Sequence, residues 1–211
     1  RCLSDWSSDV CSSDLLHGIA VNDPKLFLAR QRKPGIDTTV HLLLDTSGSM
    51  RKRIVLAGQC CWAVAQALAQ AGIPVAITAF PGLQNAFGMP TVSPVLKLGE
   101  RIGDARTVEA IGGTPLGEAL WWVLQRLVPQ REARKIVFVL TDGVPDDPPV
   151  AAQAIAAAEK LGVEVYGLGI ASQQLDILLP GTTVAVETLA ELSKAVFELV
   201  GNAVLGTRKL A

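Results

Sequence analysis

The segment Val40-His41-Leu42-Leu43-Leu44-Asp45-Thr46-Ser47-Gly48-Ser49 joins a mainly apolar run to a short polar loop. The apolar run predicts a β-strand that is covered on both faces, as in a parallel sheet. The loop that follows has one carboxylate, on Asp45, and the hydroxyls of Ser47 and Ser49. Oxygen ligands of this kind suit Mg²⁺, Mn²⁺ or Ca²⁺ better than zinc or copper. The segment therefore predicts a buried strand that ends at a site for a hard divalent cation.

Two later loops have side chains that complete such a site. Gly112-Gly113-Thr114-Pro115 supplies a third hydroxyl, and Asp142-Gly143 supplies a second carboxylate directly after the apolar strand Lys135–Thr141. In parallel α/β sheets, ligands bind beyond the carboxyl ends of the strands, where these loops are expected. The candidate metal residues are Asp45, Ser47, Ser49, Thr114 and Asp142.

Strand-like and helix-like segments alternate from Asp37 onward. Strands are predicted at Thr38–Leu44, Pro74–Phe80, Val92–Leu98, Ile136–Leu140, Val163–Leu168 and Thr182–Val186. Helices are predicted at Ile54–Ala71, Arg101–Ala110, Leu116–Val128, Val150–Leu161 and Glu187–Leu205. This alternation predicts an α/β fold with a doubly wound, mainly parallel sheet and helices on both faces. Because Pro94 cannot donate a ladder hydrogen bond, we expect its segment to be one short antiparallel strand at the edge.

The composition excludes several classes of protein. The chain has 211 residues, 49% of them hydrophobic, and a formal net charge of −1. Such a chain can bury a full core, and its near-zero charge disfavours nucleic acid as a partner. No window approaches the roughly 18 consecutive apolar residues of a membrane helix, and no secretory signal is recognisable. We therefore expect a soluble protein with no nucleic-acid or membrane partner.

The chain divides into four parts at the sequence level. Residues 1–15 resemble the conceptual translation of a sequencing-library adapter, so we expect them to be non-native and the natural protein to extend further upstream. Residues 16–36 are predicted to be a linker with a short amphipathic piece at Pro24–Gln31, residues 37–205 the domain, and residues 206–211 a tail.

Cysteines add one expectation about the compartment. Cys2 and Cys11 fall in the adapter-like part and define no disulfide framework. Cys60 and Cys61 are neighbours in a predicted helix and point in different directions, which argues against a bond between them. We expect two small buried side chains and a cytoplasmic protein.

Each candidate metal residue also has a simpler interpretation. Ser47, Ser49 and Thr114 are favoured residue types for helix N-caps. Asp142-Gly143 is a common turn pair. Their joint occurrence at three loops that follow the expected order favours the metal site over independent caps and turns.

Other polar and aromatic residues receive structural interpretations. Asp146 and Asp147 are expected to be solvated loop charges close to the site. His41, within the first strand, is expected to be a packed core residue. In Trp121-Trp122 we expect one ring in the core and one on the surface.

Enzyme interpretations find little support. The sequence has no G-x-x-x-x-G-K-[ST] phosphate loop and no G-x-S-x-G nucleophile elbow. Metal-assisted hydrolysis at Asp45 would need a general base near the ion, and the only candidates are the aspartates already assigned to the site. We assign no catalytic residue.

Asp45-x-Ser47-x-Ser49, Thr114 and Asp142 resemble the metal-ion-dependent adhesion site of von Willebrand factor A (VWA) domains. The resemblance implies that Ser47, Ser49 and Thr114 bind Mg²⁺ directly, whereas Asp45 and Asp142 act mostly through water. It also implies an open coordination position for the carboxylate of a protein partner.

The sequence around the site resembles one family more closely. Asp37–Arg51 and Gly72–Val75 are similar to the C-terminal domain of CobT, a subunit of aerobic cobaltochelatase, and Asn22–Phe27 resembles a segment that precedes that domain. Magnesium chelatase D subunits share the same kind of domain and a loop similar to Gly112-Gly113-Thr114-Pro115. The resemblance implies an AAA+ ATPase partner and a non-catalytic role in metal insertion into a tetrapyrrole. Related domains in stand-alone bacterial and phage proteins leave a scaffold or adhesion role as the alternative.

Overall fold

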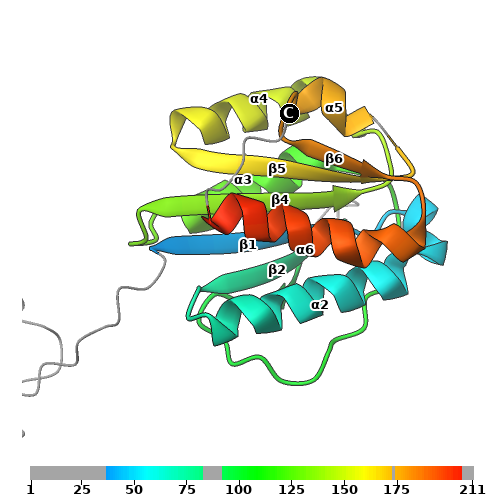
Figure 1. The fold of residues 1–211 in the computed structure, drawn as a ribbon. Helices are drawn as coiled ribbons and strands as arrows, with labels where there is room; N and C mark the ends of the chain where they lie inside the picture. The colour runs from blue at the N-terminus through cyan, green and yellow to red at the C-terminus, as the bar shows by residue number, and fades with distance from the viewer. Residues whose placement is uncertain (1–36, 83–91, 173, 206–211) are drawn as a thin grey trace, which may run out of the picture. The chain divides into compact units, whose positions relative to one another are not determined.

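The computed structural model describes residues 37–82, 92–172 and 174–205 (Figure 1). The predictions for residues 1–15, the linker 16–36 with its piece at Pro24–Gln31, and the tail 206–211 lie outside the described residues. Of the described helices, none is long and apolar enough to span a bilayer.

Six described strands form one sheet in the order β3-β2-β1-β4-β5-β6 (Figure 1). The strands are β1 (Thr38–Asp45), β2 (Val75–Phe80), β3 (Ser93–Leu96), β4 (Arg134–Thr141), β5 (Val163–Ile170) and β6 (Thr183–Val186). All neighbouring pairs are parallel except β2 and β3, which are antiparallel. The predicted short antiparallel edge strand is therefore confirmed.

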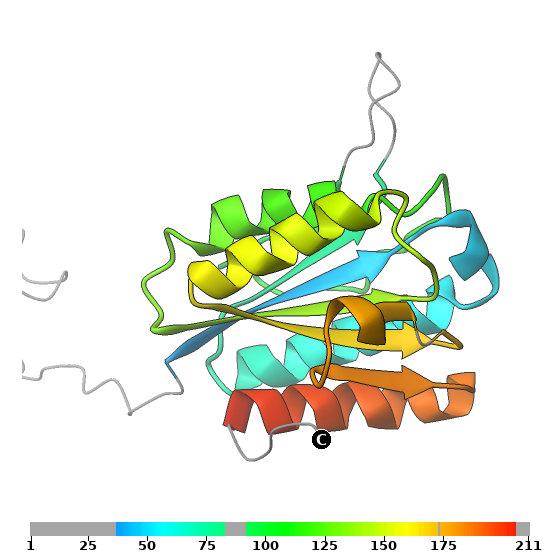
Figure 2. The same ribbon diagram turned by 90° about the horizontal axis from the view of Figure 1, so that it is seen from above.

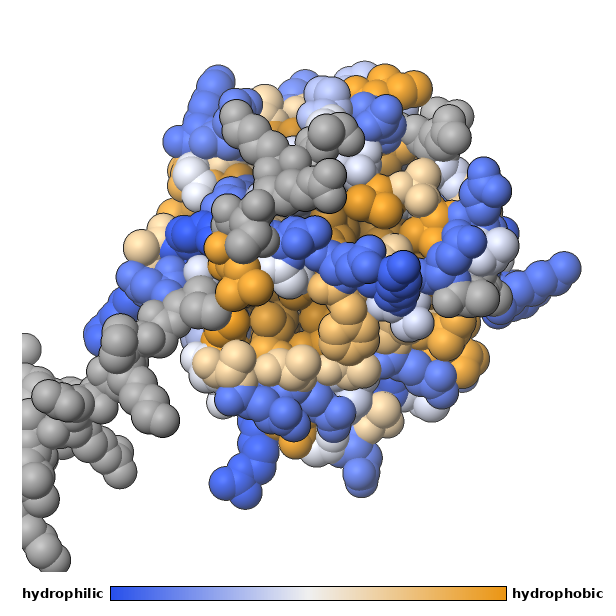
Figure 3. Space-filling model, in the orientation of Figure 1, coloured by the Kyte–Doolittle hydropathy of each residue, from blue (hydrophilic) through white to orange (hydrophobic). Residues whose placement is uncertain are grey.

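Helices cover both faces of the sheet, as predicted. They are the 3₁₀ turn η2 (Gly48–Lys52), α2 (Ile54–Gln70), α3 (Leu116–Leu127), α4 (Pro148–Lys160), α5 (Gln174–Leu178) and α6 (Leu189–Leu205). Figure 2 shows α3 and α4 on one face and α2 and α6 on the other. The outer surface of α2 and α6 mixes hydrophilic and apolar side chains (Figure 3), among them Phe197, which is 45% exposed.

The central strand β1 contributes to a core on each side of the sheet. Leu42 and Leu44 belong to the cluster that includes buried residues of α2 and α6. Leu43 belongs to the cluster that includes buried residues of α3 and α4. Because successive strand side chains point to opposite faces, a strand covered on both sides must be apolar throughout. This requirement explains why the strand is mainly apolar, with leucines on both faces.

The strand order reverses its direction of growth at β1. From β1 the chain passes through α2 to β2, and it later returns to place β4 on the other side of β1. The loops that follow β1 and β4 therefore diverge to opposite faces and leave a crevice between them. This point of the fold is where both predicted aspartates lie.

The prediction of a helix at Arg101–Ala110 is wrong. The segment is irregular and packs Ile102, Val108 and Ala110 against the α2-side core as separate anchors. Ile102 and Val108 are six residues apart and would not share one face of a helix. Arg106 donates to the Val95 carbonyl oxygen at 2.6 Å, a tertiary contact that holds the segment extended along the edge strand.

His41 is a packed core residue, as predicted. It is 2% exposed, and its Nε2 lies 2.8 Å from Thr78 Oγ1. Burial, with the nearby charge of Arg126, lowers the pKa of His41 to about 3. The two tryptophans also differ as expected: Trp121 is 38% exposed, whereas Trp122 is half-buried against the core.

His41→Gln should make the free energy of unfolding less sensitive to acid. The pKa of His41 is lower in the folded state than in the unfolded chain, so the stabilising effect of its neutral form is complete above 6.5. It is lost as the pH falls toward 3, by at most about 1.4 kcal/mol per pH unit. Urea unfolding of both proteins at neutral and mildly acidic pH measures the difference. An identical pH dependence in the variant would contradict the assignment.

Candidate metal centre

Four of the five predicted metal residues lie at the carboxyl ends of β1 and β4. Asp45 is the last residue of β1, and Ser47 and Ser49 follow in the turn that begins η2. Asp142 follows the last residue of β4, next to them in the crevice. The parallel register of β1 and β4 brings these two strand ends to the same level of the sheet.

These four residues form a continuous hydrogen-bonded chain. Asp45 Oδ1 accepts from the backbone N–H of Ser47 at 2.7 Å. The Ser47 and Ser49 hydroxyl oxygens lie 2.9 Å apart, and Ser49 Oγ donates to Asp142 Oδ1 at 2.6 Å. The structure therefore brings together two hydroxyls and two carboxylates that lie on different loops.

The fifth residue, Thr114, reaches the same place from the loop before α3. A Cβ placed on Gly143 would lie 3.3 Å from Thr114 Oγ1 and 3.9 Å from Ser49 Oγ. The two hydroxyls thus face one small space that the missing side chain of Gly143 leaves open. A bulkier residue at this position would fill that space.

Backbone hydrogen bonds hold the Thr114 loop against the loop that follows β1. Gly48 N–H donates to the Gly112 carbonyl oxygen at 3.0 Å, and Ile111 N–H donates to the Thr46 carbonyl oxygen at 2.6 Å. Main-chain contacts of this kind depend little on side-chain rotamers. These backbone contacts therefore fix the two loops that hold the hydroxyl-bearing residues relative to each other.

Comparison with known families agrees with this arrangement. Residues 26–113 match the family model described as the VWA domain of the cobalamin biosynthesis protein CobT. Over these residues the chain is similar to that VWA domain. The matched residues include Asp45, Ser47 and Ser49.

Solved structures show that the VWA fold extends over most of the chain. Proximal thread matrix protein 1 from the mussel byssus, with a zinc-occupied metal-ion-dependent adhesion site, aligns over 79% of this chain (TM-score 0.62, 18% identity). This chain spans only 46% of that protein. The manganese-loaded TRAP protein of Plasmodium vivax aligns over 77% of this chain and 73% of its own length (TM-score 0.59, 18% identity). The vWF domain of the pili tip protein Mfa5 from Porphyromonas gingivalis aligns over 81% and 96% (TM-score 0.61, 11% identity).

The donor set of this VWA-like fold fits a hard divalent cation. Neutral hydroxyls and carboxylates are the ligands that Mg²⁺, Mn²⁺ and Ca²⁺ prefer. Within the described residues, no three His, Cys, Asp or Glu side chains form a metal-binding cluster, as a structural zinc site would require. The fit therefore depends on hydroxyl ligands. Two of them, on Thr114 and Ser49, border the space that Gly143 leaves open.

Asp45 is the electrostatically costly residue of the candidate site. Its side chain is fully buried, and burial raises its pKa to about 6, although hydrogen bonds from Thr141 and Ser47 act in the opposite direction. An ionised carboxylate at such a position is stabilised by a nearby cation. Thr141, which the sequence analysis did not single out, orients the second oxygen of Asp45.

The sequence analysis did not single out Arg53, and it did not predict the hydrogen bonds that Asp146 and Asp147 make. Arg53 Nη1 lies 2.6 Å from Asp142 Oδ2, so this carboxylate pairs with a cationic guanidinium on one oxygen and accepts from the Ser49 hydroxyl on the other. Asp146 Oδ2 accepts from the Thr114 N–H at 2.8 Å and anchors the hydroxyl-bearing loop. Asp147 caps α4 by accepting from Val150 N–H. Asp146 and Asp147, expected to be loop charges that could tune the field at the site, therefore also make specific hydrogen bonds to the backbone.

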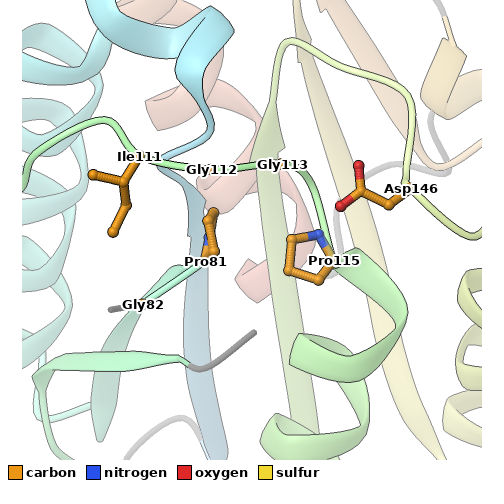
Figure 4. A pocket seen from close by; sticks show the side chains of 7 residues that line it. All are labelled: Pro81, Gly82, Ile111, Gly112, Gly113, Pro115 and Asp146. Atoms are coloured by element: carbon orange, nitrogen blue, oxygen red, sulfur yellow. The ribbon is translucent and has the colours of Figure 1, made fainter. Parts of the chain in front are cut away.

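A pocket of about 490 Å³ lies beside the Thr114 loop (Figure 4). In this view the Asp146 carboxylate points toward Gly113, and the prolines face the pocket. The lining residues are Pro81, Gly82, Ile111, Gly112, Gly113, Pro115 and Asp146. The loop that holds Thr114 thus forms one wall of this mainly apolar pocket.

Asp45→Asn should stabilise the metal-free protein at neutral pH by about 2 kcal/mol. The folded-state pKa of Asp45 lies above the unfolded value, so protonation favours folding. The corresponding stability is complete below 3.8 and is lost as the pH rises through about 6. The amide avoids this loss because it carries no charge. Chemical denaturation in EDTA across this pH range measures the effect, and a variant less stable than the wild type would contradict it.

Proposed function

We propose that this chain is a Mg²⁺-dependent protein-interaction domain whose partner supplies an acidic side chain. The hydrogen-bonded chain from Asp45 through Ser47 and Ser49 to Asp142, with Thr114 facing it, is the observation that supports this proposal. Ser47, Ser49 and Thr114 would hold the ion directly, and Asp45 and Asp142 would act mainly through water. Mn²⁺ and Ca²⁺ suit the same oxygen ligands.

The ligand chemistry explains why such a site would attract a carboxylate. Neutral hydroxyls withdraw little of the positive charge of the ion, whereas a shell of carboxylates would cancel it. When bound, the ion would supply a Lewis-acidic position for an anionic oxygen from outside. The side chains of the domain would orient that position, and Asp146 would hold the Thr114 loop in place.

The CobT family match supports a role beside an AAA+ ATPase in metal insertion into a tetrapyrrole. In that arrangement the domain would bind the AAA+ ATPase, and a separate subunit would catalyse the insertion of the metal. The free thiols of Cys60 and Cys61, both buried in α2, are compatible with a cytoplasmic location.

Ser47→Ala and Thr114→Ala should each lower the Mg²⁺ affinity by at least about tenfold, because each removes one direct oxygen ligand. Calorimetric titration of the purified chain measures the affinity. Ser193→Ala, a change at an exposed position of α6, is the matched control and should bind Mg²⁺ like the wild type.

The same variants test the interaction. A pull-down with the AAA+ ATPase encoded nearest to this gene should succeed in Mg²⁺ and fail in EDTA, and Ser47→Ala should fail in both. Absence of saturable Mg²⁺ or Mn²⁺ binding by the wild type would reject the metal site. Metal binding without a Mg²⁺-dependent ATPase interaction would retain the site and reject this partner.

A further inference from the structure

Arg53 introduces a positive charge into the candidate metal centre. It lies between η2 and α2, and its Nη1 contacts Asp142 Oδ2 at 2.6 Å. The other oxygen of Asp142 accepts from Ser49. The Arg53 side chain is 32% exposed, whereas that of Asp142 is 1% exposed. The guanidinium therefore lies at the surface of the site and touches a buried carboxylate within it.

Arg53 changes the net charge of the candidate metal centre. Asp45 and Asp142, when ionised, carry two negative charges, which would neutralise one divalent cation. Arg53 adds one positive charge through direct contact with Asp142. Asp146, whose carboxylate accepts from the Thr114 N–H, adds one negative charge at the Thr114 loop, whereas the exposed Arg51 and Lys52 add positive charge in the turn next to Arg53.

We infer that Arg53 is a specificity-determining residue that weakens metal binding and strengthens binding of an anionic partner to the loaded site. This inference rests on the proposed function, because it concerns the same metal. Like charges repel, so the guanidinium raises the free energy of the bound cation. The same guanidinium attracts the carboxylate of the partner and has N–H groups available for a charge-assisted hydrogen bond with it.

A purely structural role for Arg53 predicts the opposite effect on the metal. If the ion pair served only to hold Asp142 in position, removing the guanidinium would loosen Asp142 and weaken metal binding. If the charge of Arg53 is what matters, its removal tightens metal binding. The direction of the change in metal affinity therefore separates the two roles.

Titration with Mn²⁺, followed by electron paramagnetic resonance, tests the first half of the inference. Arg53→Gln should bind Mn²⁺ roughly three- to tenfold more tightly than the wild type, an effect limited by the solvent exposure of the guanidinium. Arg53→Lys keeps the charge and should bind Mn²⁺ like the wild type. Arg51→Gln, the same change at an exposed neighbour, is the matched control and should have a smaller effect.

Acetate serves as the probe for the second half. The titrations are repeated in sodium acetate and in sodium chloride of equal ionic strength, with a correction for the acetate complex of free Mn²⁺. If acetate binds the loaded site, it must raise the apparent Mn²⁺ affinity by reciprocal linkage. This increase should be large in the wild type and in Arg53→Lys, and several-fold smaller in Arg53→Gln.

The outcomes distinguish this inference from the proposed function. Weaker or unchanged Mn²⁺ binding by Arg53→Gln, or an undiminished acetate effect, would overturn the role of Arg53 while leaving the metal site in place. Absence of saturable Mn²⁺ binding by the wild type would reject the metal site and this inference together. Thermal unfolding in EDTA checks that Arg53→Gln is folded. If it is not, Arg53→Lys gives the test, because a diminished acetate effect in this charge-conserving variant would overturn the role of the charge.

Discussion

The parallel pairing of β1 with β4 is the constraint on which the candidate site depends. It brings Ser49 and Asp142, 93 positions apart in the sequence, into a hydrogen bond of 2.6 Å. The chain must leave β1, form the β2–β3 side of the sheet and return before this pair can form. A site assembled in this way requires the folded sheet, because no local segment contains both partners.

Electrostatics connects the stability of the domain with its proposed activity. The fully buried Asp45 has a raised pKa, so its ionised form opposes folding until a cation is near. The hydrogen bonds from Ser47 and Thr141 hold this carboxylate in one orientation, although its burial disfavours the ionised form. Arg53 has the opposite charge and contacts the other aspartate. The site thus combines a buried negative charge with a partly exposed positive one.

The fold alone does not determine what this domain binds. Structures from a mussel byssus protein and a bacterial pili tip share the fold at 18% and 11% identity. At such identities the similarity concerns backbone architecture, and function depends on the side chains at the loops. In this chain the side chains at these loops include Arg53, which touches Asp142, and Asp146, which anchors the Thr114 loop.

The amino-acid sequence alone determined the strands, most of the helices and the five candidate ligands. These follow from local signals: a strand buried on both faces must be apolar, and the polar residues that end it stand out against that run. The tertiary structure decided the irregular course of Arg101–Ala110, the pairing of Arg53 with Asp142 across 89 positions, and the contact of Asp146 with Thr114 across 32. Such contacts form only when the return of the chain brings distant loops together, and they leave no periodic pattern in the sequence.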